Sequence, residues 1–184
     1  MLIEEDRKTL LELSGAAISH ELYQYVPLEV DPQAYVPAIR EIGAAFVTLQ
    51  IEGTLRGCIG TLEAHRPLVV DVARNAGAAA FADPRFERLS RSEFERIDIH
   101  ISVLSPAQNI DFFAEADLLS KIRPHTDGLV LSDGPRRGTF LPDVWRNFPE
   151  PKQFLGQLKK KAGLPGDYWS ATIRVHRYTT ESLE

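Results

Sequence analysis

The sequence contains a single cysteine among 184 residues, so no disulfide can form within the chain. Neither this cysteine nor the five histidines follow a zinc-ligand spacing, and we predict no metal site. An iron–sulfur cluster bound by several cysteines is excluded for the same reason. The phosphate-binding loop, the dinucleotide-binding fingerprint and the hydrolase nucleophile elbow are also absent.

Long apolar runs are missing too, and none approaches the length that spans a membrane. The acidic stretch Met1–Asp6 lacks the basic and apolar regions of a signal peptide, so we expect a cytoplasmic protein without membrane contact. Basic residues are not in excess, because 21 Lys and Arg face 26 Asp and Glu and give a net charge of −5. We therefore do not expect nucleic acid as a partner, since its binders usually carry a basic footprint.

The composition is that of an ordinary globular protein, with 43% hydrophobic and 26% charged residues. A chain of this length is sufficient for one domain with a well-formed core or for two small lobes. No stretch has the composition of a linker. We therefore expect a single domain over residues 1–184, with two intertwined lobes as the alternative arrangement.

Apolar residues at helical spacing predict helices at 3–25, 67–82, 117–122 and 150–162. Alternating residues predict strands at 46–51, 55–60, 95–104, 128–131 and 171–178. A tight turn at Glu52–Thr54 would join the first two strands as a hairpin. The last strand is expected to rejoin the main sheet. The sum is an α+β fold, a mainly antiparallel sheet with helices packed on it.

The stretch Leu55–Thr61 holds the cysteine, an arginine two residues before it, and two glycines. In a regular strand Leu55, Gly57 and Ile59 share one face, and Arg56, Cys58 and Gly60 share the other. The guanidinium of Arg56 would then favour the thiolate form of Cys58. Glycine lacks a Cβ, so a ligand or another backbone can approach closely at Gly57 and Gly60.

Two interpretations of Cys58 stand side by side. As a nucleophile or redox thiol it needs a base, and His100 is a weak candidate that shares a strand face with Asp98 and Ser102. A free cysteine is also often a small buried residue without reactivity. Arg56 is either a solvated side chain or a bidentate ligand for a carboxylate or phosphate.

Asp83 and Arg85 form the next candidate pair. Asp83 can cap the turn before Pro84, and Arg85 either binds an anion or pairs with Asp83, which is the interpretation we favour. Arg136 and Arg137 lie in a glycine-containing turn and are explained equally well as an anion site or an exposed loop. The lysines at 159–161 are interpreted as a helix end, where cations offset the macrodipole.

The heptapeptide Leu55-Arg56-Gly57-Cys58-Ile59-Gly60-Thr61 resembles the signature of the AMMECR-type domain family. Bacterial and archaeal members of this family are known as protein A of the AmmeMemoRadiSam system. Further matching pieces follow in order along the chain: Asp83-Pro84-Arg85-Phe86, Ile101-Ser102-Val103-Leu104-Ser105, Thr139-Phe140-Leu141-Pro142, Lys161-Ala162-Gly163-Leu164 and Trp169. The resemblance implies a two-lobed α/β sandwich that spans nearly the whole chain.

The resemblance also implies a Memo-like protein and a radical S-adenosylmethionine enzyme as partners. One functional hypothesis is an enzyme, or enzyme component, with a cleft lined by Arg56 and Cys58. Its substrate contacts would come from the signature and the next matching piece: Gly57, Gly60, Thr61, Asp83 and Arg85. The alternative is a non-catalytic adaptor in which the signature is structural. The sequence assigns neither a cofactor nor an oligomeric state.

Overall fold

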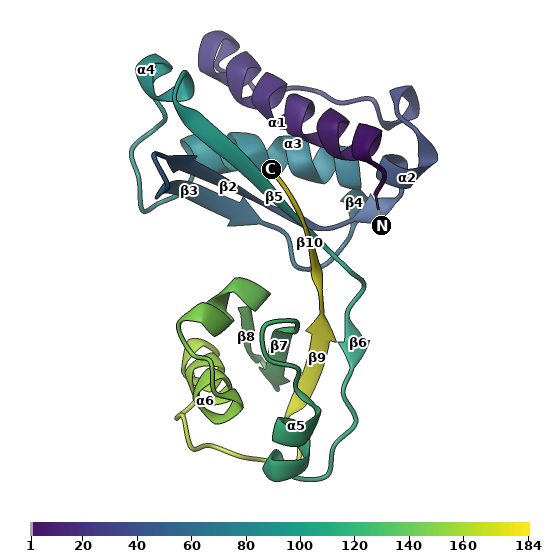
Figure 1. The fold of residues 1–184 in the computed structure, drawn as a ribbon, viewed down its shortest axis with the longest axis vertical. Coiled ribbons are helices and arrows are strands. Elements are labelled where there is room, and N and C mark those ends of the chain that lie inside the picture. The colour runs from purple at the N-terminus through teal and green to yellow at the C-terminus, as the bar shows by residue number, and fades with distance from the viewer. Residues whose placement is uncertain (1) are drawn as a thin grey trace. The chain divides into compact units, whose positions relative to one another are not determined.

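The computed structural model describes residues 2–184 and has the predicted α+β fold (Figure 1). The chain forms two compact units. The first unit comprises the chain up to Leu104 together with Glu181–Glu184, and the second comprises Ser105–Thr180. Each unit has its own four-stranded sheet and its own hydrophobic core.

Helix α1 (Glu4–Gln24) confirms the helix predicted at 3–25. Its first turn carries three acidic side chains, which stabilise the positive end of the helix macrodipole. The helix ends at Tyr25, whose φ of 60° is left-handed and whose N–H bonds the carbonyl of Glu21 at 3.0 Å. Its buried side chains recur at helical spacing and include Leu10, Leu13, Ala17, Ile18 and Leu22.

The sheet of the first unit has the strand order β10-β5-β2-β3. Its strands are β2 (Ala45–Ile51), β3 (Thr54–Gly60), β5 (Ile97–Leu104) and β10 (Thr180–Leu183). Strands β2 and β3 form the predicted hairpin, and β2 also pairs antiparallel with β5. Glu52 and Gly53 form the turn with φ values of 50° and 74°, the conformation of a two-residue turn with positive φ at both positions.

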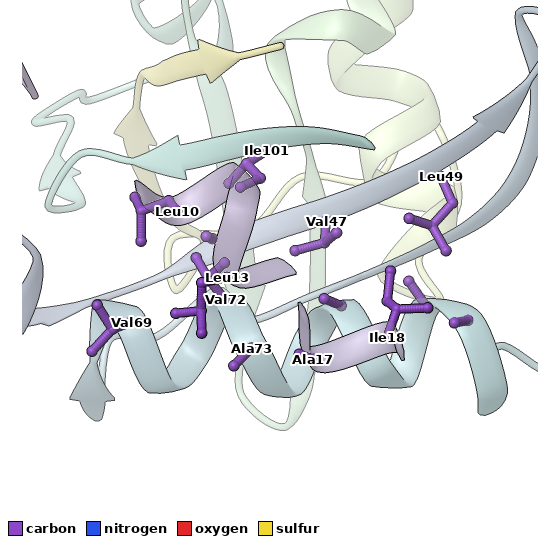
Figure 2. Packing of buried hydrophobic residues seen from close by; sticks show 14 of the residues in the cluster. Leu10, Leu13, Ala17, Ile18, Val47, Leu49, Val69, Val72, Ala73 and Ile101 are labelled. Atoms are coloured by element: carbon purple, nitrogen blue, oxygen red, sulfur yellow. The ribbon is translucent and has the colours of Figure 1, made fainter. Parts of the chain in front are cut away.

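Helix α3 (Leu68–Phe81) confirms the helix predicted at 67–82 and packs against β2, β3 and α1. Figure 2 shows side chains of α1, α3 and the strands meeting in one cluster, with Val47 and Leu49 of β2 pointing toward the helices. Both of these side chains are fully buried. Successive strand residues point to opposite faces, so the other face of the sheet carries the side chains between them.

Shorter elements complete the first unit. The proline-containing stretch after α1 forms two short helices, η1 (Pro32–Ala34) and α2 (Pro37–Arg40). A two-residue ladder joins β1 (Ile42–Gly43) to β4 (Arg66–Pro67) just before α3. The single-turn helix α4 (Arg91–Phe94) begins with a capping box in which Ser90 and Glu93 bond each other's backbone N–H.

The sheet of the second unit has the order β6-β9-β7-β8. It contains β6 (Gln108–Asn109), β7 (Gly128–Asp133), β8 (Arg136–Phe140) and β9 (Arg174–Tyr178). The strand predicted at 171–178 is β9, so the expectation that it rejoins the first sheet is wrong. The reason is burial, because Val175 belongs to the second core, whereas Leu183 of β10 belongs to the first and lies in the sheet beside β5.

The helices of the second unit are α5 (Glu115–Lys121), the 3₁₀ segment η2 (Pro142–Arg146) and α6 (Pro151–Lys161). Helix α6 confirms the prediction at 150–162, and its last turn carries the three lysines as predicted. Lys159 is fully buried and its ammonium contacts the carboxylate of Glu115 at 2.6 Å. The side chain of Lys159 therefore does not extend into solvent at the helix end but faces the core with Leu155 and Leu158.

Gly57 allows α3 and β3 to approach to backbone contact. A Cβ at this position would lie 2.1 Å from the carbonyl oxygen of Ala79, well inside any allowed separation. Any other residue would therefore push the helix away from the strand. Gly15 in α1 offers the contrast, because a Cβ there would meet only Ile99 at an ordinary 3.9 Å.

We predict that Gly57→Ala lowers the free energy of unfolding by about 1–3 kcal/mol, the usual cost of overpacking. The control Gly15→Ala should be neutral or raise it by up to about 1 kcal/mol, because alanine is the better helix former. Urea unfolding should be followed by circular dichroism, since both tryptophans lie in the second unit. Equal stability of the two variants would contradict the close contact.

Candidate functional site

Strand β3 carries a β-bulge at Arg56. Leu49 pairs with Gly57, and the next residue of β2, Gln50, pairs with Leu55, so Arg56 is an extra residue in the ladder. Paired residues of an antiparallel ladder share a face. The predicted alternation therefore holds from Gly57 to Gly60, but Leu55 lies with Gln50 on the face away from the helices and is 41% exposed.

The guanidinium of Arg56 is bound to acceptors within the chain. Its Nε and Nη2 donate to the two carboxylate oxygens of Glu93 at 2.7 and 3.2 Å, and Nη2 also donates to the carbonyl of Glu87 at 2.9 Å. This bond lowers the pKa of Glu93 from 4.5 to about 2. Within residues 2–184, the Nη1 of Arg56 is the one buried side-chain nitrogen or oxygen without a hydrogen-bond partner.

The backbone of Cys58 is bound by two side chains from the loop after α3. Asp83 accepts the N–H of Cys58 at 2.9 Å, and Arg85 donates to its carbonyl at 3.2 Å. Arg85 also donates to both oxygens of Asp83, at 2.9 and 2.7 Å, which confirms the predicted pairing. The bonds from Arg85 hold the pKa of the buried Asp83 carboxyl well below its ordinary value.

The thiol of Cys58 is half-buried and receives a hydrogen bond from the hydroxyl of Thr48 at 3.3 Å. Thr48 pairs with Cys58 on one side and with His100 on the other, so the three side chains form one row across β3, β2 and β5. This row lies on the face away from the helices. At its far end, Nδ1 of His100 lies 3.5 Å from the carboxylate of Glu184.

One arginine is electrostatically linked to Cys58. The pKa of Arg85 is raised above its ordinary value, chiefly by the hydrogen bond to Asp83 and with a smaller contribution from the charge of Cys58. The structure thus brings Cys58, Asp83 and Arg85 together at one end of the row of side chains. Arg56 lies two residues before Cys58 in strand β3, but its guanidinium is bonded to the carboxylate of Glu93 and the carbonyl of Glu87.

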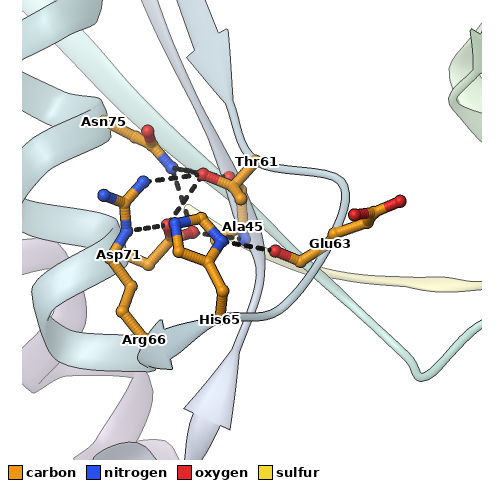
Figure 3. Close-up of polar contacts among 7 residues, drawn as sticks. All are labelled: Ala45, Thr61, Glu63, His65, Arg66, Asp71 and Asn75. Carbon is orange, nitrogen blue, oxygen red and sulfur yellow. Dashed lines mark hydrogen bonds and ion pairs between the residues drawn. The ribbon is translucent and has the colours of Figure 1, made fainter.

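The remaining signature residues have partners within the fold. A Cβ at Gly60 would lie 2.2 Å from the ring of Phe46, so the glycine accommodates that ring. The hydroxyl of Thr61 donates to Asp71 at 2.7 Å and accepts from Arg66 and Asn75 at 3.1 and 3.2 Å (Figure 3). A hydroxyl has one donor and two acceptor positions, so the capacity of Thr61 is used by the fold.

Comparison with known proteins identifies the family to which this chain belongs. The model of the AMMECR1 family matches residues 11–183. The chain belongs to the AMMECR1 family.

Among the residues that the structure describes, no group of three or more His, Cys, Asp and Glu side chains is arranged to bind a metal ion. None of the described helices is long and apolar enough to cross a membrane.

Relatives of this AMMECR1-family protein cover almost the whole chain. A protein of Methanothermobacter thermautotrophicus is 34% identical over 182 residues, which cover 98% of this chain and 94% of the relative. Protein MJ0810 of Methanocaldococcus jannaschii is 33% identical over 156 residues, covering 83% and 78%. The crystal structure of the uncharacterized protein PH0010 from Pyrococcus horikoshii matches with a TM-score of 0.89 and 30% identity over 98% of this chain and 92% of that one.

A buried polar network beside Thr61 was missed by the sequence reasoning. The fully buried Asp71 accepts from Arg66 at 2.7 Å, from the N–H of Ala45 at 2.9 Å and from Asn75 at 3.0 Å (Figure 3). These bonds join the start of β2 to helix α3. The available signal was the spacing of Asp71 and Asn75, two polar residues four apart and so on one face of a helix whose other residues, apart from Arg74, are apolar.

We predict that Glu93→Gln lowers the free energy of unfolding by about 1–3 kcal/mol at neutral pH, because it weakens a charged hydrogen bond to a largely buried arginine. The folded-state pKa of about 2 lies below the ordinary 4.5, so the pair stabilises the fold fully above pH 4.5. Its contribution is lost as the pH falls toward 2. The difference between wild type and variant should therefore shrink over this interval.

The measurement is the urea midpoint at neutral pH and at steps down to about pH 2. Glu52→Gln is the matched control, since the contact of Glu52 with Arg96 is exposed on both sides and should contribute less than about 1 kcal/mol. A wild-type advantage over Glu93→Gln that persists unchanged at the lowest pH would show that the ion pair is not its source.

Proposed function

We propose that this AMMECR1-family protein is protein A of an AmmeMemoRadiSam-type system, and that it supplies Cys58 as a reactive thiol. It would act with a Memo-like protein and a radical S-adenosylmethionine enzyme. One observation carries this proposal. Of the three side chains in the signature that can do chemistry, those of Arg56 and Thr61 each make several hydrogen bonds within the fold, whereas the half-buried thiol of Cys58 takes part in one, from the hydroxyl of Thr48.

Two side chains contact Cys58 beside its thiol, Thr48 and Arg85. The Thr48 hydroxyl donates to the sulfur, and a hydrogen bond donated to the charged form favours that form. The guanidinium of Arg85 also lies at Cys58, where it donates to the backbone carbonyl while it pairs with Asp83. The thiolate would add to an electrophilic carbon of the substrate that is double-bonded to a heteroatom, and the displaced electron pair would move to that heteroatom. His100, the candidate base, lies in the same row but two strands from Cys58, with Thr48 between them, so it would act on the substrate and not on the sulfur. A free thiol of this kind persists in a reducing compartment, which favours the cytoplasm.

A second candidate, a non-catalytic adaptor, is favoured by the packing of the signature. Gly57 lies against the backbone of α3, Gly60 accommodates the ring of Phe46, and Arg56 is paired with Glu93. In that case the signature forms a docking surface for the Memo-like protein and the radical S-adenosylmethionine enzyme. The side chain of Cys58 would then serve only to pack within the fold.

The proposal predicts that Cys58 reacts rapidly with iodoacetamide at neutral pH and that Thr48→Val slows the reaction. Losing one hydrogen bond of about 1 kcal/mol corresponds to about a fivefold lower rate. Thr9→Val is the control, because its hydroxyl bonds the carbonyl of Glu5 on an exposed helix surface. Rates should be measured across pH with intact-mass detection. Equal rates for wild type and Thr48→Val would remove the support for an activated thiol.

Reconstitution with the two partners separates the two candidates. If the thiol is catalytic, Cys58→Ala abolishes formation of the S-adenosylmethionine-dependent product, while the variant still binds both partners. An adaptor requires that Cys58→Ala retain product formation. Binding measured by size-exclusion chromatography shows that any loss is not a loss of assembly.

A further inference from the structure

A small cavity of about 190 Å³ lies in the second unit, where two chain segments diverge. The ladder between β6 and β9 is continued by a bond from the N–H of Ile110 to the carbonyl of Val175 at 2.9 Å. Beyond that bond, residues 109–113 and 169–174 line the cavity from opposite sides. We call it the fork pocket. No residue of the candidate thiol site belongs to it.

One wall of the fork pocket is aromatic and firmly supported. The rings of Phe112 and Trp169 pack at 5.7 Å with an angle of 55°. Trp169 is backed by the ammonium of the fully buried Lys159, 5.3 Å from the ring centre, and Lys159 in turn contacts Glu115. A buried ion pair behind an aromatic ring restricts its movement, so the wall is preformed.

A third aromatic ring, that of Phe113, is exposed to solvent beside this wall. Phe113 lines the same pocket and is 90% exposed, the largest exposure among the bulky hydrophobic side chains that the structure describes. In the described part of the chain, the ring of Phe113 has no aromatic neighbour and one cationic neighbour, the ammonium of Lys121, which lies 5.3 Å from the ring centre. An exposed phenylalanine at the mouth of a pocket is available to cover a bound ring.

The polar side of the fork pocket offers one uncommitted cation. Arg174 is exposed, and its side chain has no hydrogen bond or ion pair with any residue in the described part of the chain. The other polar side chains are engaged: Ser170 donates to Asp133, and Asp111 accepts from Asn109 at 2.6 Å. An unpaired guanidinium beside aromatic walls is suited to a carboxylate or phosphate attached to a ring.

We propose that the fork pocket binds a single planar ring that bears one anionic group. The ring packs against Phe112 and Trp169, and the anion bonds the guanidinium of Arg174. The volume of the fork pocket limits the ligand to a single ring, because pockets for drug-sized ligands range from about 300 to 1,000 Å³ and this pocket is smaller. Asp111 lies on the same lining and disfavours a second negative charge.

Tryptophan fluorescence provides a direct test. Trp169 lines the pocket, whereas Trp145 is fully buried and stacked on Phe154 at 3.8 Å, so a ligand-dependent change should vanish in Trp169→Phe. The probes are 3-phenylpropionate and methyl phenyl phosphate, which each carry one negative charge, with neutral 3-phenylpropanamide as the matched analogue of the carboxylate. We expect saturable binding of at least one anion, and about tenfold weaker binding of the amide. The preferred anion identifies the group that Arg174 recognises.

The matched variants are Arg174→Gln and Arg146→Gln, which remove exposed arginines of the same unit inside and outside the pocket. Arg174→Gln should raise the Kd of the anion about tenfold, and Arg146→Gln should leave it unchanged. Unchanged urea midpoints show that both variants fold. The proposal is overturned if neither anion saturates at millimolar concentration, if the amide binds as tightly, or if both variants behave like wild type.

Discussion

The β-bulge at Arg56 is the constraint on which the first unit depends. In an uninterrupted hairpin from the same turn, Cys58 would pair with Val47, whose side chain is fully buried against the helices. The extra residue shifts the ladder by one, so Cys58 pairs with Thr48 on the opposite face instead. The same shift directs Gly57 toward α3, where only a glycine fits. One residue thus decides both the packing of the helix and the position of the thiol.

Three carboxylates fix the strand that contains this bulge. Glu93 binds Arg56, Asp83 binds the backbone N–H of Cys58, and Asp71 binds Thr61. Each of these three carboxylates is bonded to an arginine, so their three negative charges are paired. Strand β3 is therefore held at points two or three residues apart along its length. Such rigidity is compatible with a preorganised reactive thiol and equally with a fixed docking surface, and for that reason both functions are proposed above.

Local patterns in the sequence predicted the regular elements well. Alternation gave β2 and β5, helical spacing gave α1, α3 and α6, and turn chemistry gave the hairpin. The bulge was not predictable in this way, because a ladder shift depends on both strands and on the Glu93 bond, which comes from a helix 37 residues away. Thr48 therefore went unnoticed as the partner of Cys58.

Other errors share this non-local origin. The sheet to which β9 belongs is set by which core buries Val175, and the burial of Lys159 depends on Glu115, which is 44 residues away. The sequence shows Asp71 and Asn75 as polar residues in a mainly apolar helix, but it does not show their partners in β2 and β4. The pairing of Asp83 with Arg85 was predictable because the two residues are two apart in the chain.

The clamp formed by Asp83 and Arg85 has a further consequence for how this protein meets other chains. Strand β3 is the last strand of its sheet, and an outer strand ordinarily offers unpaired N–H and carbonyl groups to any passing strand. At Cys58 both groups are already occupied by side chains. The sheet therefore cannot be extended there by a neighbouring molecule, and the depressed pKa of Asp83 keeps this protection in place throughout the physiological pH range.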